Sequence, residues 1–202
     1  CCTFNGTNQY LQLGKNDLLN FGNDDFVINI KFNSTSTTGW RMIMCDNASS
    51  TNFIDIDADY KLLAIKVGGS RYDTPLNSIM PNTVYNVIIQ VINSILTVKI
   101  NDIQSTLDGL PSQIVSNVNF NLSSNTFIGQ YFDGTERFKG TIYSIKVLRN
   151  TSDITLLESS GSGGQVCREV IVPNAPLDVR YPLKLNSLDS FTTEWSQLNT
   201  NS

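Results

Sequence analysis

The stretch Val84–Gln104 repeats apolar residues with a period of two, and this pattern constrains the fold more than any other part of the chain. One face of the pattern carries large apolar residues: Tyr85, Val87, Ile89, Val91, Leu96, Val98 and Ile100. The polar pair Asn93-Ser94 separates the two runs. This period is typical of β-strands, because an amphipathic helix would not place Val98 and Ile100 on one side and Lys99 on the other. The stretch therefore predicts a central hairpin with a tight turn at Asn93-Ser94.

Similar short runs recur along the chain, separated by turn residues. Strands are expected within Thr3–Gly14, Phe26–Phe32, Trp40–Asp46, Asn52–Ala58, Lys61–Val67, Thr126–Gln130, Phe138–Leu148 and Ile154–Leu157. Arg71–Pro81 and Tyr131–Arg137 are expected to be loops, and Pro111–Val118 is compatible with a single helical turn. About a dozen short strands with almost no helical period predict an all-β sandwich.

Alternation within Trp40–Asp46 divides its side chains between two faces. One face is expected to hold Trp40, Met42 and Met44, and the other Arg41, Ile43 and Cys45. Since Trp40 leads an apolar strand, we expect it in the core rather than at a ligand site.

Length, composition and charge exclude several classes of function. The chain has 202 residues, 40% of them hydrophobic and 16% charged, which is enough to bury a sizeable core. A net charge of −4 and a pI near 4.7 argue against nucleic-acid binding through a basic groove. The chain has no histidine, which excludes histidine-based zinc sites and Ser-His or Cys-His catalytic pairs. No signal peptide or membrane-spanning run is present, and the first residue is not Met, so we expect a processed product or a piece of a longer chain.

The cysteines do not predict a metal site or a disulfide framework. Cys1 and Cys2 are adjacent, and Cys45 and Cys167 lie far away, so zinc-type spacing is absent. Cys45 lies in an apolar run and is expected to be a buried free thiol. The disulfide state of the four residues stays open at this point.

The composition changes near residue 159, which sets the expected domain boundaries. Residues 1–158 are expected to form the β-sandwich, and the SSGSGG sequence of residues 159–164 is typical of a flexible linker. Residues 165–202 are too few for a core of their own. They form a short C-terminal extension, a docking segment or the start of a further domain.

Four segments together resemble laminin G-like domains of the concanavalin A-like superfamily. They are TFNGTNQYLQLG, FVINIKF, NTVYNVIIQVINSILTVKINDIQ and TFIGQYFDGTERFKGTIYSIKVLRN, in the order in which the family places its opening strand, second strand, central hairpin and closing segment. The resemblance runs from about Thr3 to Asn150 and implies a two-sheet antiparallel jelly roll. The chain departs from the family pattern at Asn101-Asp102, which replaces Asn-Gly, so a residue other than Gly must adopt the backbone angles of that turn.

The row Asp55, Asp57 and Asp59 is the first candidate for chemistry. Three carboxylates at alternate strand positions share one face, about 6.6 Å apart at each step. We expect a solvated acidic face, with a calcium site as the first alternative because calcium prefers clustered oxygen ligands. Related sandwich glycosidases carry E-x-D-x-x-E on such a strand, with two Glu as nucleophile and acid/base, whereas this chain has D-I-D-A-D.

A pair of loops is the second candidate, because each combines an aromatic residue with an Asp. The candidate ligand-binding residues are Arg71, Tyr72, Asp73, Tyr131, Asp133 and Arg137. A sugar needs a flat aromatic face for its C–H groups and a few fixed polar groups for its hydroxyls. The alternative is that Tyr72 and Tyr131 pack at the loop bases and that Asp133-Gly134 is a turn.

The expected function is a non-catalytic carbohydrate-binding or adhesion module, a lectin-like domain that recognises a glycan or glycoprotein surface. The expected location is extracellular, on a cell surface or on a virion. Calcium is the one candidate cofactor, and neither nucleic acid nor membrane insertion is expected. The first alternative is a structural or attachment domain of a virion or cell-surface assembly, with a protein partner or self-assembly through residues 165–202. The second alternative is a glycoside hydrolase.

Overall fold

A computed structural model of the chain describes residues 2–13, 19–22, 24–46, 51–115, 126–149 and, for the backbone alone, 152–158. The expected linker and extension, residues 159–202, lie outside the described residues. Among the described residues, no helix is long and apolar enough to cross a membrane.

The strands form two antiparallel sheets. Sheet A contains β1 (Cys2–Asn5), β3 (Phe26–Ser34), β8 (Val84–Ile92), β9 (Ile95–Ile100), β10 (Ile103–Ser105), β11 (Gln113–Ile114), β13 (Lys139–Arg149) and β14 (Ser152–Glu158). Its spatial order is β1-β13-β3-β8-β9-β10, with β14 also paired to β13 and β11 to β9. Sheet B contains β2 (Leu11–Leu13), β12 (Thr126–Ile128), β4 (Trp40–Asp46), β5 (Phe53–Asp57), β6 (Leu62–Val67) and β7 (Ser70–Asp73), in that spatial order.

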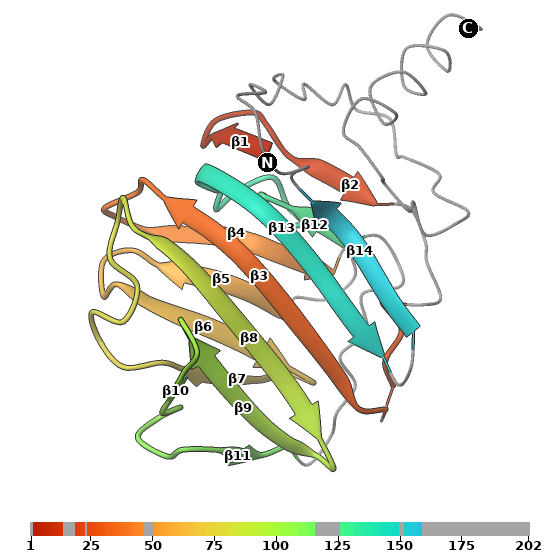
Figure 1. Cartoon of the computed structure of the whole chain (residues 1–202). Helices are drawn as coiled ribbons and strands as arrows, with labels where there is room; N and C mark the ends of the chain where they lie inside the picture. The colour runs from red at the N-terminus through yellow and green to blue at the C-terminus, as the bar shows by residue number, and fades with distance from the viewer. Residues whose placement is uncertain are drawn as a thin grey trace, which may run out of the picture.

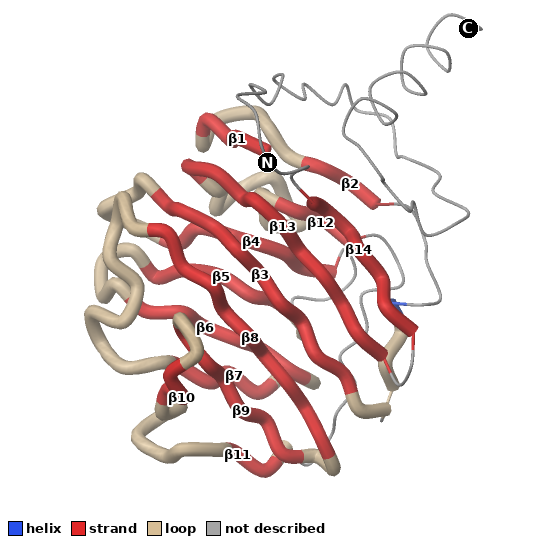
Figure 2. Tube along the Cα trace, in the orientation of Figure 1, coloured by secondary structure: helices blue, strands red, loops and turns tan. Residues whose placement is uncertain are grey.

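The two sheets lie face to face, with β13, β3, β8 and β9 in front of β4, β5, β6 and β7 in the view of Figure 1. Strands make up most of the described chain, and loops join them at both ends of the sandwich (Figure 2). The predicted all-β sandwich is confirmed. Because β-strand side chains alternate between faces, each sheet gives one apolar face to the shared core.

The core between the sheets is built from the predicted alternation. In β3 the inward residues Phe26, Ile28, Ile30 and Phe32 are all buried. Phe32 packs edge-on against Phe138 with ring centres 6.3 Å apart. The predicted hairpin is formed by β8 and β9, and its turn residues Asn93 and Ser94 have φ values of 50° and 63°.

Three local predictions need correction. The expected loop after residue 70 begins with an edge strand, because Arg71, Tyr72 and Asp73 pair with β6 as β7. The helical turn considered for Pro111–Val118 is wrong for its described part, since Gln113 pairs with Leu96 in β11. The simple alternation predicted for β4 is also wrong.

A β-bulge in β4 explains that last error. Met42 lies opposite Asp55 and Met44 opposite Ile54, so Ile43 is an extra residue relative to β5. The bulge turns both Ile43 and Met44 towards the main core, while Met42 joins a separate cluster on the outer face of sheet B. The alternation of apolar residues in β4 could not reveal this bulge. A bulge is an extra residue relative to the paired strand, and the sequence of one strand does not show how it pairs with the next.

Candidate functional site

The outer face of sheet B, turned away from the main core, gathers most of the sequence's candidate residues. The strand register aligns one row of side chains across β4, β5, β6 and β7: Met42, Asp55, Ala64 and Asp73. In the next row Trp40 lies opposite Asp57. The core face of β5 is occupied by Ile54 and Ile56. Asp55 and Asp57 therefore project from the outer face, as the sequence predicted.

Asp55 is the most unusual residue on this face. Its side chain is buried, with only 1% of the residue exposed, and its Oδ1 atom has no hydrogen-bond partner. Burial raises the pKa of Asp55 well above its usual value, the neighbouring charge of Glu136 raises it further, and Arg71 acts in the opposite direction. A buried carboxyl oxygen without a partner is energetically costly, so Asp55 is a candidate for contact with another group.

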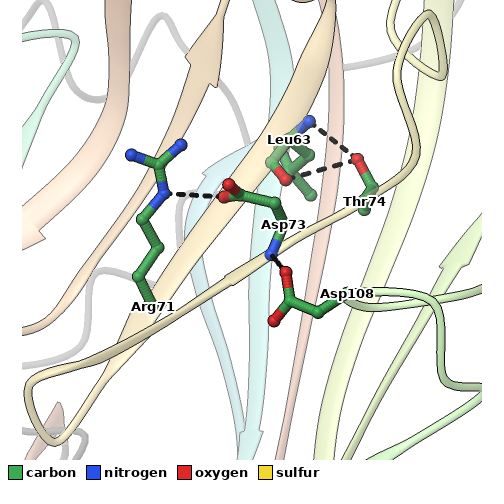
Figure 3. Close-up of polar contacts among 5 residues, drawn as sticks. All are labelled: Leu63, Arg71, Asp73, Thr74 and Asp108. Carbon is green, nitrogen blue, oxygen red and sulfur yellow. Dashed lines mark hydrogen bonds and ion pairs between the residues drawn. The ribbon is translucent and has the colours of Figure 1, made fainter.

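Arg71 joins the acidic row to an aromatic ring. Its guanidinium carbon lies 4.3 Å from the centre of the Trp40 ring, the geometry of a cation–π contact. Its Nε donates a hydrogen bond of 2.7 Å to Asp73 Oδ1 (Figure 3). Burial acts to lower the pKa of Arg71, but the hydrogen bond to Asp73 and the charges of Asp55 and Asp57 outweigh it and raise that pKa. Trp40 is half-buried on this outer face, which corrects its expected place in the core.

The strand that carries Arg71 is held from both sides. The backbone N–H of Asp73 donates to Asp108 Oδ1 at 3.1 Å, and the N–H of Asp108 donates to the Asp73 carbonyl oxygen at 2.9 Å. On the β6 side, Thr74 Oγ1 accepts from the N–H of Leu63 at 2.8 Å and donates to its carbonyl oxygen at 3.3 Å. Figure 3 shows the bond from the Asp73 N–H to the Asp108 carboxylate and the two bonds between Thr74 and Leu63. These bonds fix the edge strand and therefore the base of the Arg71 side chain.

Glu136 completes the site and was missed by sequence reasoning. It is half-buried, its φ is 50°, and its carbonyl oxygen accepts a hydrogen bond of 2.9 Å from the N–H of Met42. Burial raises the pKa of Glu136, and the charge of Asp133 adds to the effect. The loop's acidic composition was the one signal in the sequence, but it did not reveal the contact with β4.

The aspartates at 57 and 59 stabilise turns. Asp57 Oδ1 accepts hydrogen bonds of 3.2 Å from the N–H groups of both Asp59 and Tyr60. Asp59 Oδ2 accepts from the N–H of Gly39 at 3.0 Å. The expected solvated face is wrong for two of the three aspartates, since Asp55 and Asp57 are buried. The described residues contain no group of three or more carboxylate or thiol side chains placed to hold a metal ion, so calcium binding stays a prediction.

The second candidate loop packs on the apolar half of the same face. The ring of Tyr131 lies 6.5 Å from that of Phe53, beside the buried cluster of Met42, Cys45 and Phe127. Asp133 is exposed, and its Oδ1 accepts hydrogen bonds from Thr135 that lower the pKa of Asp133. These contacts support the alternative in which Tyr131 packs at the loop base and Asp133 forms a turn.

The two remaining candidates also lie away from the Arg71 contact. The Arg137 guanidinium carbon lies 5.8 Å from the centre of the Tyr10 ring, and its Nε donates to the Gly134 carbonyl oxygen at 2.9 Å. Tyr72 occupies the other face of β7 and packs against the main core. Of the six predicted ligand residues, the structure thus joins Arg71 and Asp73 to Trp40, Asp55 and Glu136.

No protein-family model matches the chain, and no curated protein matches it. Among solved structures, domains LG4-5 of the mouse laminin alpha1 chain match with a TM-score of 0.55 and 13% identity over 76% of this chain and 41% of the laminin chain. The chain has the laminin G-like jelly-roll fold.

Two further structures share this jelly roll. A Bacteroides ovatus protein described as a candidate for carbohydrate binding has a TM-score of 0.57 and 17% identity, over 71% of this chain and 42% of that protein. The CBM40 module of the Ruminococcus gnavus IT-sialidase, in a structure with α2,3 sialyllactose bound, has a TM-score of 0.52 and 10% identity, over 69% of this chain and 89% of the module. The chain spans less than half of the first two proteins. At these identities the likeness concerns the fold alone.

Proposed function

We propose that the chain is a non-catalytic carbohydrate-binding module that holds a glycan against the outer face of sheet B. One observation carries this proposal: the Arg71 guanidinium lies over the Trp40 ring on the same face of sheet B as Asp55, whose Oδ1 has no hydrogen-bond partner. An aromatic face suits the C–H groups of a sugar, and fixed charged groups suit its hydroxyls. Asp73 holds Arg71 over the ring in the free protein through a hydrogen bond, which shows that this ring face accepts a polar group.

The fold supports the same class of function. Two of the proteins with this jelly roll, from Bacteroides ovatus and Ruminococcus gnavus, are described as carbohydrate-binding. The second was solved with α2,3 sialyllactose bound. Binding of a glycan or glycoprotein surface implies work outside the cell or at its surface, which is where we place this chain. The ligand face lies on the sheet rather than in the two loops that the sequence favoured.

A glycan array with matched variants tests the proposal. We expect the wild-type chain to bind a restricted set of glycans and Trp40→Ala to lose that binding. Tyr143→Ala is the control, because Tyr143 lies on sheet A, where its ring contacts Lys31. Silence across a broad array, or unchanged binding by Trp40→Ala, would contradict the proposal. Repeating the array with a calcium chelator tests the predicted cofactor separately.

One observation favours the glycoside hydrolase alternative. Asp55 and Glu136 are neighbouring carboxyls whose pKa values are both raised, a property of general acids. A retaining or inverting hydrolase also needs a second, ionised carboxylate beside the glycosidic bond. Asp57 is engaged by two backbone N–H groups and Asp73 by Arg71, which disfavours catalysis. Release of reducing ends from an oligosaccharide, lost in Asp55→Asn, would establish the hydrolase instead.

A different surface favours the attachment alternative. Ile92, Ile95 and Ile114 lie side by side in the register of β8, β9 and β11 and are 41%, 44% and 81% exposed. Exposed apolar rows of this kind occur at protein contacts. A role in a virion or cell-surface assembly predicts that the chain self-associates or captures a partner. Oligomer size, measured by light scattering for the full chain and for residues 1–158, tests this role, and identical monomers would argue against it.

A further inference from the structure

The charge on the outer face of sheet B restricts the class of glycan that fits there. Asp55, Asp57 and Asp73 all act on Arg71, and Glu136 acts on Asp55. Three carboxyl groups therefore act on one guanidinium, and a fourth acts on the most buried of them. An anionic sugar placed on this face would meet net negative charge, and like charges disfavour binding.

Arg71 already shows how a cation is held at this position. Its guanidinium has an aromatic ring on one side, at 4.3 Å from the Trp40 centre, and the Asp73 carboxylate at 2.7 Å from Nε. The side chain of Arg71 is 37% exposed, so solvent reaches it. Asp55 is buried with its Oδ1 unpartnered, so one acceptor on this face is unused in the free protein. A second positive group is what that acceptor lacks.

We propose that this face selects a glycan with a positively charged amino group, a hexosamine without its acetyl group, whose ring stacks on Trp40 and whose ammonium donates to Asp55. This inference rests on the proposed carbohydrate-binding function. Arg71 holds the place of the ligand's cation in the free protein and moves aside when the sugar binds. The ionised form of Asp55 only accepts hydrogen bonds, and an ammonium carries three donors and no acceptor, so the two groups match when Asp55 has lost its proton.

An N-acetylated or neutral sugar fits less well. A sugar hydroxyl can donate to Asp55, but it supplies no charge to balance the four carboxyl groups. Displacing Arg71 with a neutral group would also leave Asp73 without its cation. Charge-assisted hydrogen bonds are about twice as strong as neutral ones, so the amino form is favoured.

The groups around Asp55 give this selection a pH dependence. The charged groups that act on Asp55 are Asp57 from β5, Arg71 and Asp73 from β7, and Glu136 from the loop before β13. Its partners in the strand register, Met42 on β4 and Ala64 on β6, are uncharged. Burial and Glu136 hold the pKa of Asp55 high. Raising the pH ionises Asp55 and strengthens its bond to an ammonium. Affinity for the amino sugar therefore rises with pH until the amine itself loses its proton.

Calorimetric titration with four tetrasaccharides tests the inference: β-1,4-linked glucosamine, its N-acetylated form, the glucose analogue and a sialylated oligosaccharide. We expect the wild-type chain to prefer the glucosamine oligomer by about tenfold, the scale of one charge-assisted hydrogen bond. Asp55→Asn should remove that preference and its pH dependence. Arg71→Ala should bind the same oligomer more tightly, because the competing guanidinium is gone. Asp102→Asn, which removes a carboxylate from an exposed turn of sheet A, is the control and should change nothing.

The outcomes separate this inference from the function on which it rests. Equal or tighter binding of the N-acetylated, glucose or sialylated oligomer overturns the inference and leaves carbohydrate binding in place. Absence of binding to all four oligomers, by both the wild-type chain and Arg71→Ala, together with silence on the glycan array, overturns both. Arg71→Ala tests the inference independently of any folding defect in Asp55→Asn, since a gain of binding cannot come from an unfolded chain.

Discussion

Gly129 lies against the ring of Phe4, so a methyl group on its Cα would come within 2.7 Å of two ring carbons. The residue connects β4 with the residue before β13: its N–H donates to the Ile43 carbonyl oxygen at 3.0 Å, and its own carbonyl oxygen accepts from the N–H of Phe138 at 2.9 Å. Its φ is +84°, a value that L side chains rarely adopt. The loop that carries Glu136 therefore starts from a position where space and backbone both require glycine.

Gly129→Ala should destabilise the fold for both reasons. We expect a loss of about 3 kcal/mol in the free energy of unfolding, from backbone strain together with overpacking against Phe4. Gly109→Ala is a matched control, since Gly109 has the same φ of +84° but nothing within 4 Å of the added methyl. That variant should lose about 1 kcal/mol, the backbone part alone. Equal losses in urea titrations of the two variants would rule out the steric contribution of Phe4.

The hairpin turn at Ser94 offers a stabilising substitution. Ser94 is exposed and has a φ of 63°, which glycine adopts without the Cβ clash that other residues suffer. Ser94→Gly should raise the free energy of unfolding by about 0.5 kcal/mol. This is the relief of backbone strain in the folded chain minus the extra conformational entropy that glycine gives the unfolded chain. Ser70→Gly, at an exposed position of β7, should lower it instead. Urea midpoints that move the same way in both variants would contradict this account of the turn.

Cys45 should be protected from alkylation in the folded chain. It is buried, and burial together with the charge of Asp46 raises the pKa of its thiol, so very little reactive thiolate forms near neutral pH. Peptide mapping after iodoacetamide treatment should recover Cys45 unmodified from native protein and modified from protein in concentrated urea. Rapid native alkylation would mean that the apolar cluster over Cys45 opens readily.

Sequence reasoning succeeded where the determining contacts are local. The hairpin was predictable because Val98, Lys99 and Ile100 alternate within a few residues, and the turn between its strands is marked by polar residues. The turn at Asn101-Asp102 was also foreseen: both residues have positive φ, and Asn101 Oδ1 accepts a hydrogen bond of 2.9 Å from the N–H of Asn86. The prediction of Cys45 as a buried free thiol is also confirmed, because the apolar residues around it in the sequence already indicated burial.

Sequence reasoning failed where two distant segments decide the outcome. The bulge at Ile43 depends on the register of β4 with β5. The edge strand β7 has too few apolar residues to show the alternation that predicts a strand. Glu136 reaches the site because its loop crosses β4 at Met42, which no local pattern records. Arg71 and Asp55 were each singled out, but the stacking of Arg71 on Trp40 needed the arrangement of four strands.

The raised pKa of Asp55 makes a prediction about stability and pH. Because the folded chain holds the Asp55 proton more tightly than the unfolded chain does, stability is lost as pH rises from about 4 towards the folded pKa. Asp55→Asn removes the ionisable group and keeps the shape. The variant should therefore be more stable than wild type near neutral pH, and the difference should shrink as pH falls towards about 4. Urea midpoints of both proteins across this range measure the difference.

Asp57→Asn should show no such gain, because the Asp57 carboxylate already accepts two backbone hydrogen bonds. A destabilised Asp55→Asn at neutral pH would mean that the ionised carboxylate is stabilised in the folded chain, contrary to its burial and its unpartnered oxygen.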